Sequence, residues 1–230
     1  MTAAASEAPA SEALIAFEDE DLGYGGRTLL PALELAIACG ERVALLGRSG
    51  AGKSTLLEAL RARLARSAAW CPQADALVPM LSVYHNVYMG RLDAFSRTRN
   101  LINLLRPQRA SWAAVAALTA ELGLSGLMSR RVSTLSGGQR QRVMIARALY
   151  QQRSIFLGDE PVSSVDPRQG GALVELIERR HPTCIIALHQ RELALSHFDR
   201  IIGLDAGRIV LDADANTLTR GDLDVLYAEH

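Results

Sequence analysis

An α/β fold with a mostly parallel sheet and an inserted helical lobe is predicted by three features of the sequence. Short apolar segments such as ERVALLG (41–47), SIFLGDE (154–160) and CIIALHQ (184–190) alternate with helical patterns, which is typical of a parallel sheet covered on both faces. A glycine-rich loop connects the first of these strands to a leucine-rich helix. From residue 75 to about 150 the pattern becomes mostly helical, which indicates the inserted lobe.

Each further element follows from its local pattern. Residues 67–70 form a second short strand before the tripeptide CPQ. In the lobe, residues 115–124 form an amphipathic helix that ends at a glycine, and Pro107 together with nearby arginines breaks the chain before it. Residues 170–180 form a crossover helix, and residues 201–212 form a hairpin around 205–207. The acidic run 18–21 is interpreted as a solvated turn.

The 230 residues suit one domain with an inserted lobe. We expect a disordered tail over residues 1–13, which are rich in Ala, Ser and Glu, and a single domain over residues 14–230. The sheet-containing core spans about 14–74 and 151–211, the helical lobe spans about 75–150, and a C-terminal segment covers 212–230.

The composition argues against several classes of protein. The formal net charge is zero, so no overall field attracts nucleic acid or an anionic membrane. Four arginines at positions 97, 99, 106 and 109 are interpreted as a solvated helix face rather than a nucleic-acid site. Three widely spaced cysteines favour a reducing compartment. With no signal-peptide pattern and no apolar run of roughly 18 to 20 residues, any membrane role is expected to go through a partner.

Residues 47–54, GRSGAGKS, fit the pattern G-x-x-x-x-G-K-[ST] between a strand and a helix. Glycines let successive backbone N–H groups point at phosphate oxygens, and the helix N-terminus adds partial positive charge. Lys53 is the only lysine among 25 basic residues; here it would reach the outer phosphates while Ser54 ligates Mg²⁺. The alternative is a flexible glycine loop without a ligand. The predicted nucleotide-binding residues of this loop are Gly47, Arg48, Ser49, Gly50, Ala51, Gly52, Lys53, Ser54 and Thr55.

Two acids, Asp159 and Glu160, end the strand SIFLGD. Ligands of such sheets bind at the carboxyl ends of the strands, so Asp159 is expected to hold Mg²⁺ through water. Glu160 would polarise an attacking water as general base, a role that contributes about 10²–10⁴-fold. The alternative is a strand end with two solvated acids, which the nearby phosphate loop makes the weaker interpretation.

A second glycine turn, TLSGGQ (134–139), precedes the helical run RQRVMIARALY. A serine followed by glycines at a helix start is another anion site. One nucleotide needs only one phosphate loop. Standing alone, this turn would therefore be interpreted as a helix cap.

The phosphate loop, LSGGQ and FLGDEP together resemble the ATP-binding cassette (ABC) ATPase family over about residues 14–212. The resemblance implies a phosphate-loop nucleotidase core with a small antiparallel β part, and ATP and Mg²⁺ as cofactors. It also implies a dimer in which LSGGQ of one subunit closes over ATP held by the phosphate loop of the other. Ser136, Gly137 and Gly138, followed by Gln139, would then contact the γ-phosphate across the interface.

The same resemblance assigns further residues. Tyr24 would stack on adenine, Gln73 would sense the nucleotide, the metal and the membrane partner, and Asp166 would be the acid of the loop 163–166 that links the two sites. His189 would be the switch histidine that holds the γ-phosphate and the water. The expected catalytic residues are thus Glu160, His189, Gln73 and Lys53, and the expected metal ligands are Ser54, Gln73 and Asp159.

Two departures from the family pattern matter. Only 20 residues separate Lys53 from Gln73, so the antiparallel part that flanks adenine must be trimmed, which puts base contacts in question. Gly158 also stands where the family usually has alanine before the metal acid.

Several segments resemble the phosphonate importer ATPases: MGRL (89–92), NLINLLRP, DEPVSSVDP (159–167), LHQRELAL (188–195) and DRIIGLDAGRIV (199–210). This resemblance implies an ATPase on the cytoplasmic face of the inner (plasma) membrane that powers import of a phosphonate or related phosphorus oxyanion. The implied partners are permease subunits docked on residues 74–91, a second ATPase subunit that is expected to be identical, and indirectly a solute-binding protein, with no nucleic acid.

Other functions stay open. One is a soluble ABC ATPase that acts on nucleic acid or the ribosome, and another is an importer ATPase for a different small solute. A non-hydrolysing regulator would not need Glu160 and His189, and a phosphate-loop kinase would not need LSGGQ.

Overall fold

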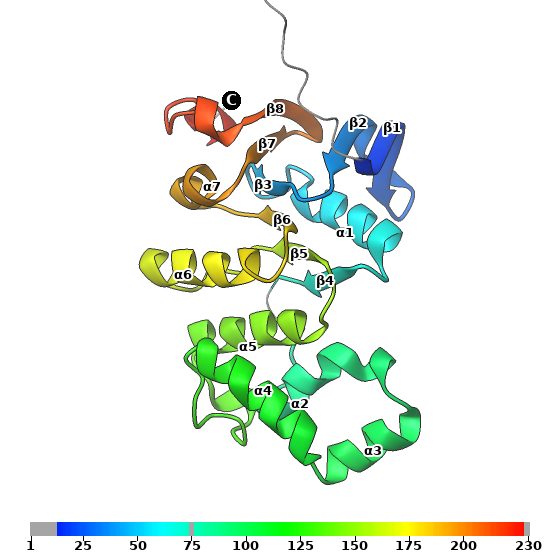
Figure 1. Cartoon of the computed structure of the whole chain (residues 1–230). Coiled ribbons are helices and arrows are strands. Elements are labelled where there is room, and N and C mark those ends of the chain that lie inside the picture. The colour runs from blue at the N-terminus through cyan, green and yellow to red at the C-terminus, as the bar shows by residue number, and fades with distance from the viewer. Residues whose placement is uncertain (1–12, 74–75, 228–230) are drawn as a thin grey trace, which may run out of the picture.

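The computed structural model describes residues 13–73 and 76–227 of the chain. The tail predicted for residues 1–13 lies outside the described residues except for Ala13, which begins the first strand. Two sheets and two helical layers make up the described chain (Figure 1).

A six-stranded sheet forms the centre of the molecule, in the order β4-β5-β6-β3-β7-β8. Neighbouring strands pair in parallel from β4 to β7, and β8 pairs antiparallel with β7. The strands are β3 (Arg42–Leu46), β4 (Ala68–Cys71), β5 (Ile155–Asp159), β6 (Thr183–Ala187), β7 (Arg200–Asp205) and β8 (Arg208–Asp214). Because the first five are parallel, their carboxyl ends meet at one edge of the sheet.

The sheet is covered on both faces, as its apolar strands predict. Successive residues of β3 enter two different cores: Val43 and Leu45 belong to one, Ala44 and Leu46 to the other. The first core contains α1 (Lys53–Leu64) and the β1–β2 hairpin. The second contains α6 (Pro167–Glu178), α7 (Arg191–His197) and the helical lobe. The alternation follows from the two-residue period of a strand.

The hairpin of β1 (Ala13–Tyr24) and β2 (Arg27–Ala38) is a separate antiparallel sheet. The interpretation of residues 18–21 as a turn is wrong, because these residues lie inside β1. A register shift between Phe17 and Glu20, with Asp19 at a φ of 53°, shows an irregularity that sends these acids outward without ending the strand. Between Lys53 and Gln73 the structure has only α1 and β4, which accounts for the short spacing.

The helical lobe contains α2 (Val83–Tyr88), α3 (Arg97–Leu105), α4 (Arg109–Glu121) and α5 (Gly137–Tyr150). Two expectations need correction here. Arg97 and Arg99 do not break the chain but lie inside α3, and α4 begins at residue 109 rather than 115 because Pro107 alone interrupts the helical path. The fold class itself, an α/β core with an inserted helical lobe, is confirmed. None of the helices in the described ranges is long and apolar enough to cross a membrane.

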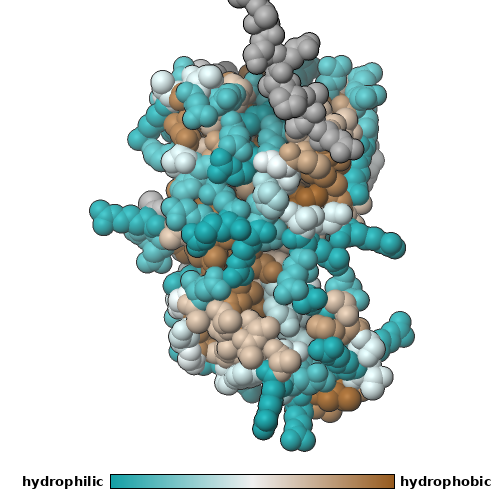
Figure 2. All heavy atoms as spheres, viewed as in Figure 1, coloured by the Kyte–Doolittle hydropathy of each residue, from teal (hydrophilic) through white to brown (hydrophobic). Residues whose placement is uncertain are grey.

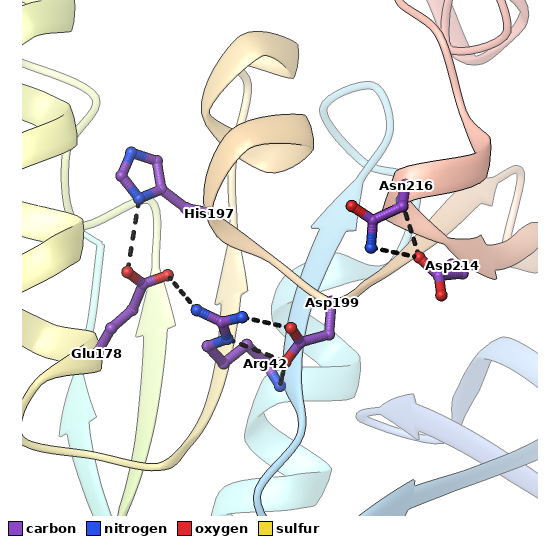
Figure 3. A network of polar contacts seen from close by, with 6 residues as sticks. All are labelled: Arg42, Glu178, His197, Asp199, Asp214 and Asn216. Atoms are coloured by element: carbon purple, nitrogen blue, oxygen red, sulfur yellow. Dashed lines mark hydrogen bonds and ion pairs between the residues drawn. The ribbon is translucent and has the colours of Figure 1, made fainter.

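An ion-pair network ties helix ends to strand starts at the amino edge of the sheet (Figure 3). Nε of Arg42, the first residue of β3, donates to Oδ2 of Asp199 at 2.9 Å. Glu178 at the end of α6 lies 3.7 Å from the Arg42 guanidinium and 3.5 Å from Nδ1 of His197. Hydrogen bonding from Arg42 lowers the pKa of Asp199, whereas burial raises the pKa of Glu178. The network anchors α6 and α7 on the side of the sheet opposite the phosphate loop.

Candidate nucleotide-binding and catalytic site

The phosphate loop lies at the carboxyl edge of the sheet, between β3 and α1. Gly47 has a φ of 142°, and a Cβ there would lie 2.1 Å from the carbonyl oxygen of Leu204 on β7. Gly52 has a φ of 110°, and its Cβ would press on Leu30 of β2. Both glycines are therefore required for the backbone path as well as for close approach of a ligand. Because Gly52 has no side chain, the N-terminus of α1 is left open to an anion.

Lys53 is buried and folds back over the loop. Its Nζ donates to the carbonyl oxygen of Gly47 at 2.7 Å and to that of Arg48 at 3.1 Å. Burial lowers the pKa of Lys53, and the charges of Glu160 and Asp159 oppose that shift. The ammonium group is thus desolvated, close to two carboxylates, and held where triphosphate oxygens would replace the carbonyls as acceptors.

Asp159, the last residue of β5, is buried, and within the described residues its Oδ1 has no hydrogen-bond partner. Burial raises the pKa of Asp159, and a hydrogen bond with the Ser54 side chain lowers it. A buried acceptor without a partner costs about 1–3 kcal/mol. A hard cation next to Ser54 and Asp159 would remove that cost, and oxygen donors are those that Mg²⁺ prefers. These residues therefore fit a magnesium ion.

Glu160 brings three strand ends together. Its Oε1 lies 2.6 Å from Nε2 of His189, which follows β6, and its Oε2 accepts from Nε2 of Gln73 at 3.2 Å, after β4. The backbone N–H of Glu160 donates to Ala187 at 3.1 Å, and its φ of 52° is left-handed. A non-glycine residue held there indicates strain imposed by its surroundings. The predicted switch histidine and sensor glutamine thus each contact one oxygen of the predicted base.

The second glycine turn (134–139) leads into the capped N-terminus of α5. Ser136 caps α5 by accepting from the N–H of Gln139, and the Gln139 side chain accepts from the N–H of Ser136, so a capping box is complete. Each of the two side chains therefore accepts from the backbone N–H of the other residue, and none of their described hydrogen bonds reaches the phosphate loop of the same chain. Gly138 lies against the loop 163–166, since a Cβ there would be 3.3 Å from the oxygen of Ser164.

Two predicted site residues stay apart from this cluster. Tyr24 ends β1 with its side chain 75% exposed, so the ring is available for stacking but has no described ring contact. Asp166 caps α6 by accepting from the N–H of Arg168 at 3.0 Å. In the isolated chain its role is that of a helix cap.

The sequence analysis missed Gln141. This buried side chain of α5 donates to the carbonyl oxygen of Glu160 at 2.9 Å and to Oγ of Ser163 at 3.1 Å, and it accepts from the N–H of Ser164 at 2.6 Å. It therefore connects the LSGGQ helix to the loop behind the predicted base. The sequence does contain a signal for this role. Gln141 is a polar residue one helical turn before Ile145, among the apolar residues that this helix buries.

Tyr227 was also missed. Burial raises the pKa of its hydroxyl and the Gly47 backbone opposes that shift, although no described group has the geometry of a hydrogen bond to this hydroxyl. The Arg191 guanidinium carbon lies 4.8 Å from the centre of its ring. No sequence motif marks Tyr227, because its position depends on how the C-terminal segment returns to the sheet.

Comparison with known proteins shows which family the sequence resembles. Residues 30–67 and 61–163 match the ABC transporter family. The phosphonates import ATP-binding protein PhnC of Pseudomonas putida is 38% identical over 248 residues, covering 95% of this chain and 91% of that protein. PhnC 1 of Pseudomonas syringae pv. syringae is 40% identical over 232 residues, 88% of this chain and 87% of that protein.

Solved structures show the same fold. A nucleotide-free ATP-binding cassette from an ABC transporter superposes with a TM-score of 0.76 at 19% identity, covering 95% of this chain and 100% of that one. A bacterial Atm1-family ABC exporter with ATP bound gives a TM-score of 0.73 at 25% identity, covering 96% of this chain and 43% of that one. Since the family match extends over both glycine turns and the acidic end of β5, the chain belongs to the ABC transporter family and is one of its ATPases.

Proposed function

We propose that this chain hydrolyses ATP to power a membrane importer, with a phosphonate or a related phosphorus oxyanion as the transported solute. The observation that carries the hydrolytic part is the contact of Glu160 with both His189 and Gln73 beside the buried Asp159 and Lys53. The solute rests on the names of the relatives, which are phosphonates import proteins over nearly their whole length.

The chemistry of the site follows from the side chains at the carboxyl edge. Loop residues 47–55 and the open N-terminus of α1 bind the phosphates, and Lys53 exchanges its two carbonyl partners for phosphate oxygens. Ser54, Asp159 and Gln73 would hold Mg²⁺, which when bound supplies positive charge to the phosphate oxygens. Glu160 orients and deprotonates the attacking water, while His189 and Gln73 fix the carboxylate by binding one oxygen each.

A second copy of the chain completes the site. The capped N-terminus of α5 offers Ser136, Gly137 and Gly138 at the surface, away from its own phosphate loop. A helix N-terminus favours anions, so we infer that this turn closes over the γ-phosphate of ATP held by the partner subunit. In the closed dimer Asp166 would link the two sites and Tyr24 would stack on adenine.

The remaining partners follow from the importer role. The chain would lie on the cytoplasmic face of the plasma membrane, with a permease docked on residues 76–91 of the described surface and on the preceding Ala74 and Asp75, which lie outside the described residues. A solute-binding protein would act through that permease. The transported solute would not touch this subunit, and no nucleic acid takes part.

Reconstitution tests the proposal. The chain and its permease are placed in liposomes, and phosphate release is measured with a solute-binding protein loaded with a phosphonate, with phosphate, or with an unrelated solute. We expect stimulation by the phosphonate-loaded protein, and by the phosphate-loaded protein if the oxyanion class is broad. Turnover that responds only to the unrelated solute would contradict the substrate class. Turnover that responds to RNA or ribosomes but not to the permease would favour the soluble alternative.

A further inference from the structure

Helix α3 of the lobe is packed with its polar side inward. Asn103, the one buried residue of this helix, accepts from the Tyr84 hydroxyl at 2.8 Å and from the N–H of Gln108 at 3.0 Å. Asn100 accepts from the Tyr88 hydroxyl at 2.9 Å and donates to the carbonyl oxygen of Leu92 at 2.9 Å. Hydrogen bonds rather than apolar packing therefore fix α3 to the lobe.

The apolar side of α3 faces outward. Four large aliphatic side chains are exposed, and they are Leu101 (61%), Ile102 (49%), Leu104 (48%) and Leu105 (81%). A surface helix normally buries such residues and exposes its amides. In Figure 2 a hydrophobic area, drawn in brown, lies at the lower right, where α3 lies in Figure 1. The reversed arrangement indicates that something outside the chain covers this face.

Positive charge surrounds the exposed leucines. From residue 94 to residue 120 the sequence contains arginines at 97, 99, 106 and 109 and no acid, although the whole chain has zero net charge. Arg97 is exposed one helical turn before Leu101 and therefore lies on the same face. Arg106 and Arg109 are exposed just beyond the helix, whereas Arg99 turns inward over the ring of Phe95.

We propose that α3 contacts the anionic surface of the lipid bilayer, with its leucines in the headgroup region and its exposed arginines on lipid phosphates. Charge complementarity selects this occupant, because protruding aliphatic side chains in a segment whose charged residues are all arginines are the pattern of helices that lie in a membrane interface. The long arginine side chains can reach phosphates while their stems follow the leucines. The proposal takes from the proposed function only the location of the chain at a membrane.

Vesicle co-sedimentation of the full chain, without nucleotide or permease, tests this. Phosphatidylcholine vesicles with and without phosphatidylglycerol are compared at low and high salt. We expect partition onto the anionic vesicles that weakens with salt. The double variant Leu101→Ser/Leu105→Ser should reduce partition by at least about 100-fold, and Arg97→Gln should reduce it about five-fold on anionic vesicles alone.

A matched control is Val210→Ser, which removes another exposed aliphatic side chain, 54% exposed on β8. It should leave partition unchanged. Absence of partition by the natural chain, or equal partition by the double variant and the control, overturns the proposal.

If the double variant instead loses affinity for detergent-solubilised permease, α3 docks on protein. If the double variant no longer forms a dimer in size exclusion, α3 docks on a second copy. ATP hydrolysis with the permease in detergent should be unchanged in the double variant, so failure of the lipid contact and failure of the proposed function are separable.

Discussion

At the carboxyl edge of the central sheet, Asp159 has a buried oxygen that no described residue satisfies, and Glu160 is held at a left-handed φ. At the amino edge of the same strands, Arg42 pairs with both Asp199 and Glu178, and Glu178 also pairs with a histidine (Figure 3). Both edges carry charged residues at strand and helix ends. They differ in how far the charges are matched within the chain: the acids of the amino edge each form an ion pair, although Oε1 of Glu178 is also buried without a hydrogen bond, whereas Asp159 has no ion-pair partner among the described residues.

The difference identifies the edge that needs a ligand. A half-exposed ion pair such as Arg42–Asp199 contributes little beyond anchoring. Unmatched buried groups and strained residues that gather at one place mark a candidate functional site. The open N-terminus of α1, the carbonyl-bound Lys53 and the orphaned Asp159 oxygen are all groups that a magnesium–triphosphate would satisfy. Paired substitutions, one at each edge, can test that interpretation.

The largest difference in turnover is expected between Glu160→Gln at the carboxyl edge and Glu178→Gln at the amino edge. The first removes the base but keeps an amide near His189 and Gln73, so the turnover number should fall about 10²–10⁴-fold while ATP still binds. The second only weakens the pairs with Arg42 and His197. Because burial already disfavours the charge of Glu178, this variant should not lower the melting temperature, and it should leave turnover unchanged.

Steady-state phosphate release and thermal melting of both variants make the comparison, and size exclusion with ATP shows whether Glu160→Gln accumulates a closed dimer. Turnover in Glu160→Gln near that of the natural chain would remove Glu160 as the base. A similar loss in Glu178→Gln would show that the amino edge also contributes to catalysis.

The next largest contrast is expected between Lys53→Arg at the carboxyl edge and Arg42→Lys at the amino edge. In Lys53→Arg the planar guanidinium cannot replace an ammonium that makes two bonds inside a closed loop, so ATP affinity should fall about 10–100-fold. In Arg42→Lys the forked contact to Asp199 is lost, which should lower stability by about 1 kcal/mol and leave ATP affinity unchanged. Fluorescent-nucleotide titration and melting distinguish them, and unchanged affinity in Lys53→Arg would rule out the assigned role.

The carboxyl edge was largely predictable from the sequence because its signals are local. Lys53 and Ser54 stand in a loop of fixed spacing, and Asp159 and Glu160 directly end an apolar strand. His189 and Gln73 required the family resemblance, since a lone histidine or glutamine has no local signature. The fold class followed from the same alternation of strands and helices.

Elements that depend on distant partners were not predictable. The run 18–21 was assigned to a turn because its acids are polar, yet pairing with β2 holds it in a strand. The inward face of α3 depends on Tyr84 and Tyr88 of another helix, and Gln141 acts on residues about twenty positions away. The amino-edge network joins Arg42 to residues more than 130 positions away. No local pattern contains such pairings.

A smaller effect is expected for Gln141→Leu, compared with Gln151→Leu at the end of the same helix. Gln141 holds the backbone of Glu160 and the loop at Ser163, so the turnover number should fall roughly ten-fold with the Michaelis constant for ATP unchanged. Gln151 bonds only the backbone of Trp70 and should affect melting but not turnover. An equal rise of the Michaelis constant in Gln141→Leu would indicate loss of binding rather than positioning.

The smallest effects are opposite shifts of stability at the two edges. Arg42 lowers the pKa of Asp199, so its pairing stabilises the fold above the usual carboxyl pKa and is lost as the pH falls through the lower folded value. Burial raises the pKa of Asp159, so its charge destabilises the ligand-free fold at neutral pH and that cost disappears on protonation.

At pH 7 without nucleotide, Asp199→Asn should lower the free energy of unfolding by at most about 1 kcal/mol, and Asp159→Asn should raise the free energy of unfolding. Urea titrations from neutral to acidic pH should show the Asp159→Asn difference shrinking first, as the pH falls from the raised pKa of Asp159 to the usual carboxyl pKa, and the Asp199→Asn difference shrinking only below the usual carboxyl pKa. A loss of stability in Asp159→Asn at pH 7 would mean that its carboxylate is already matched, and the contrast between the edges would fail.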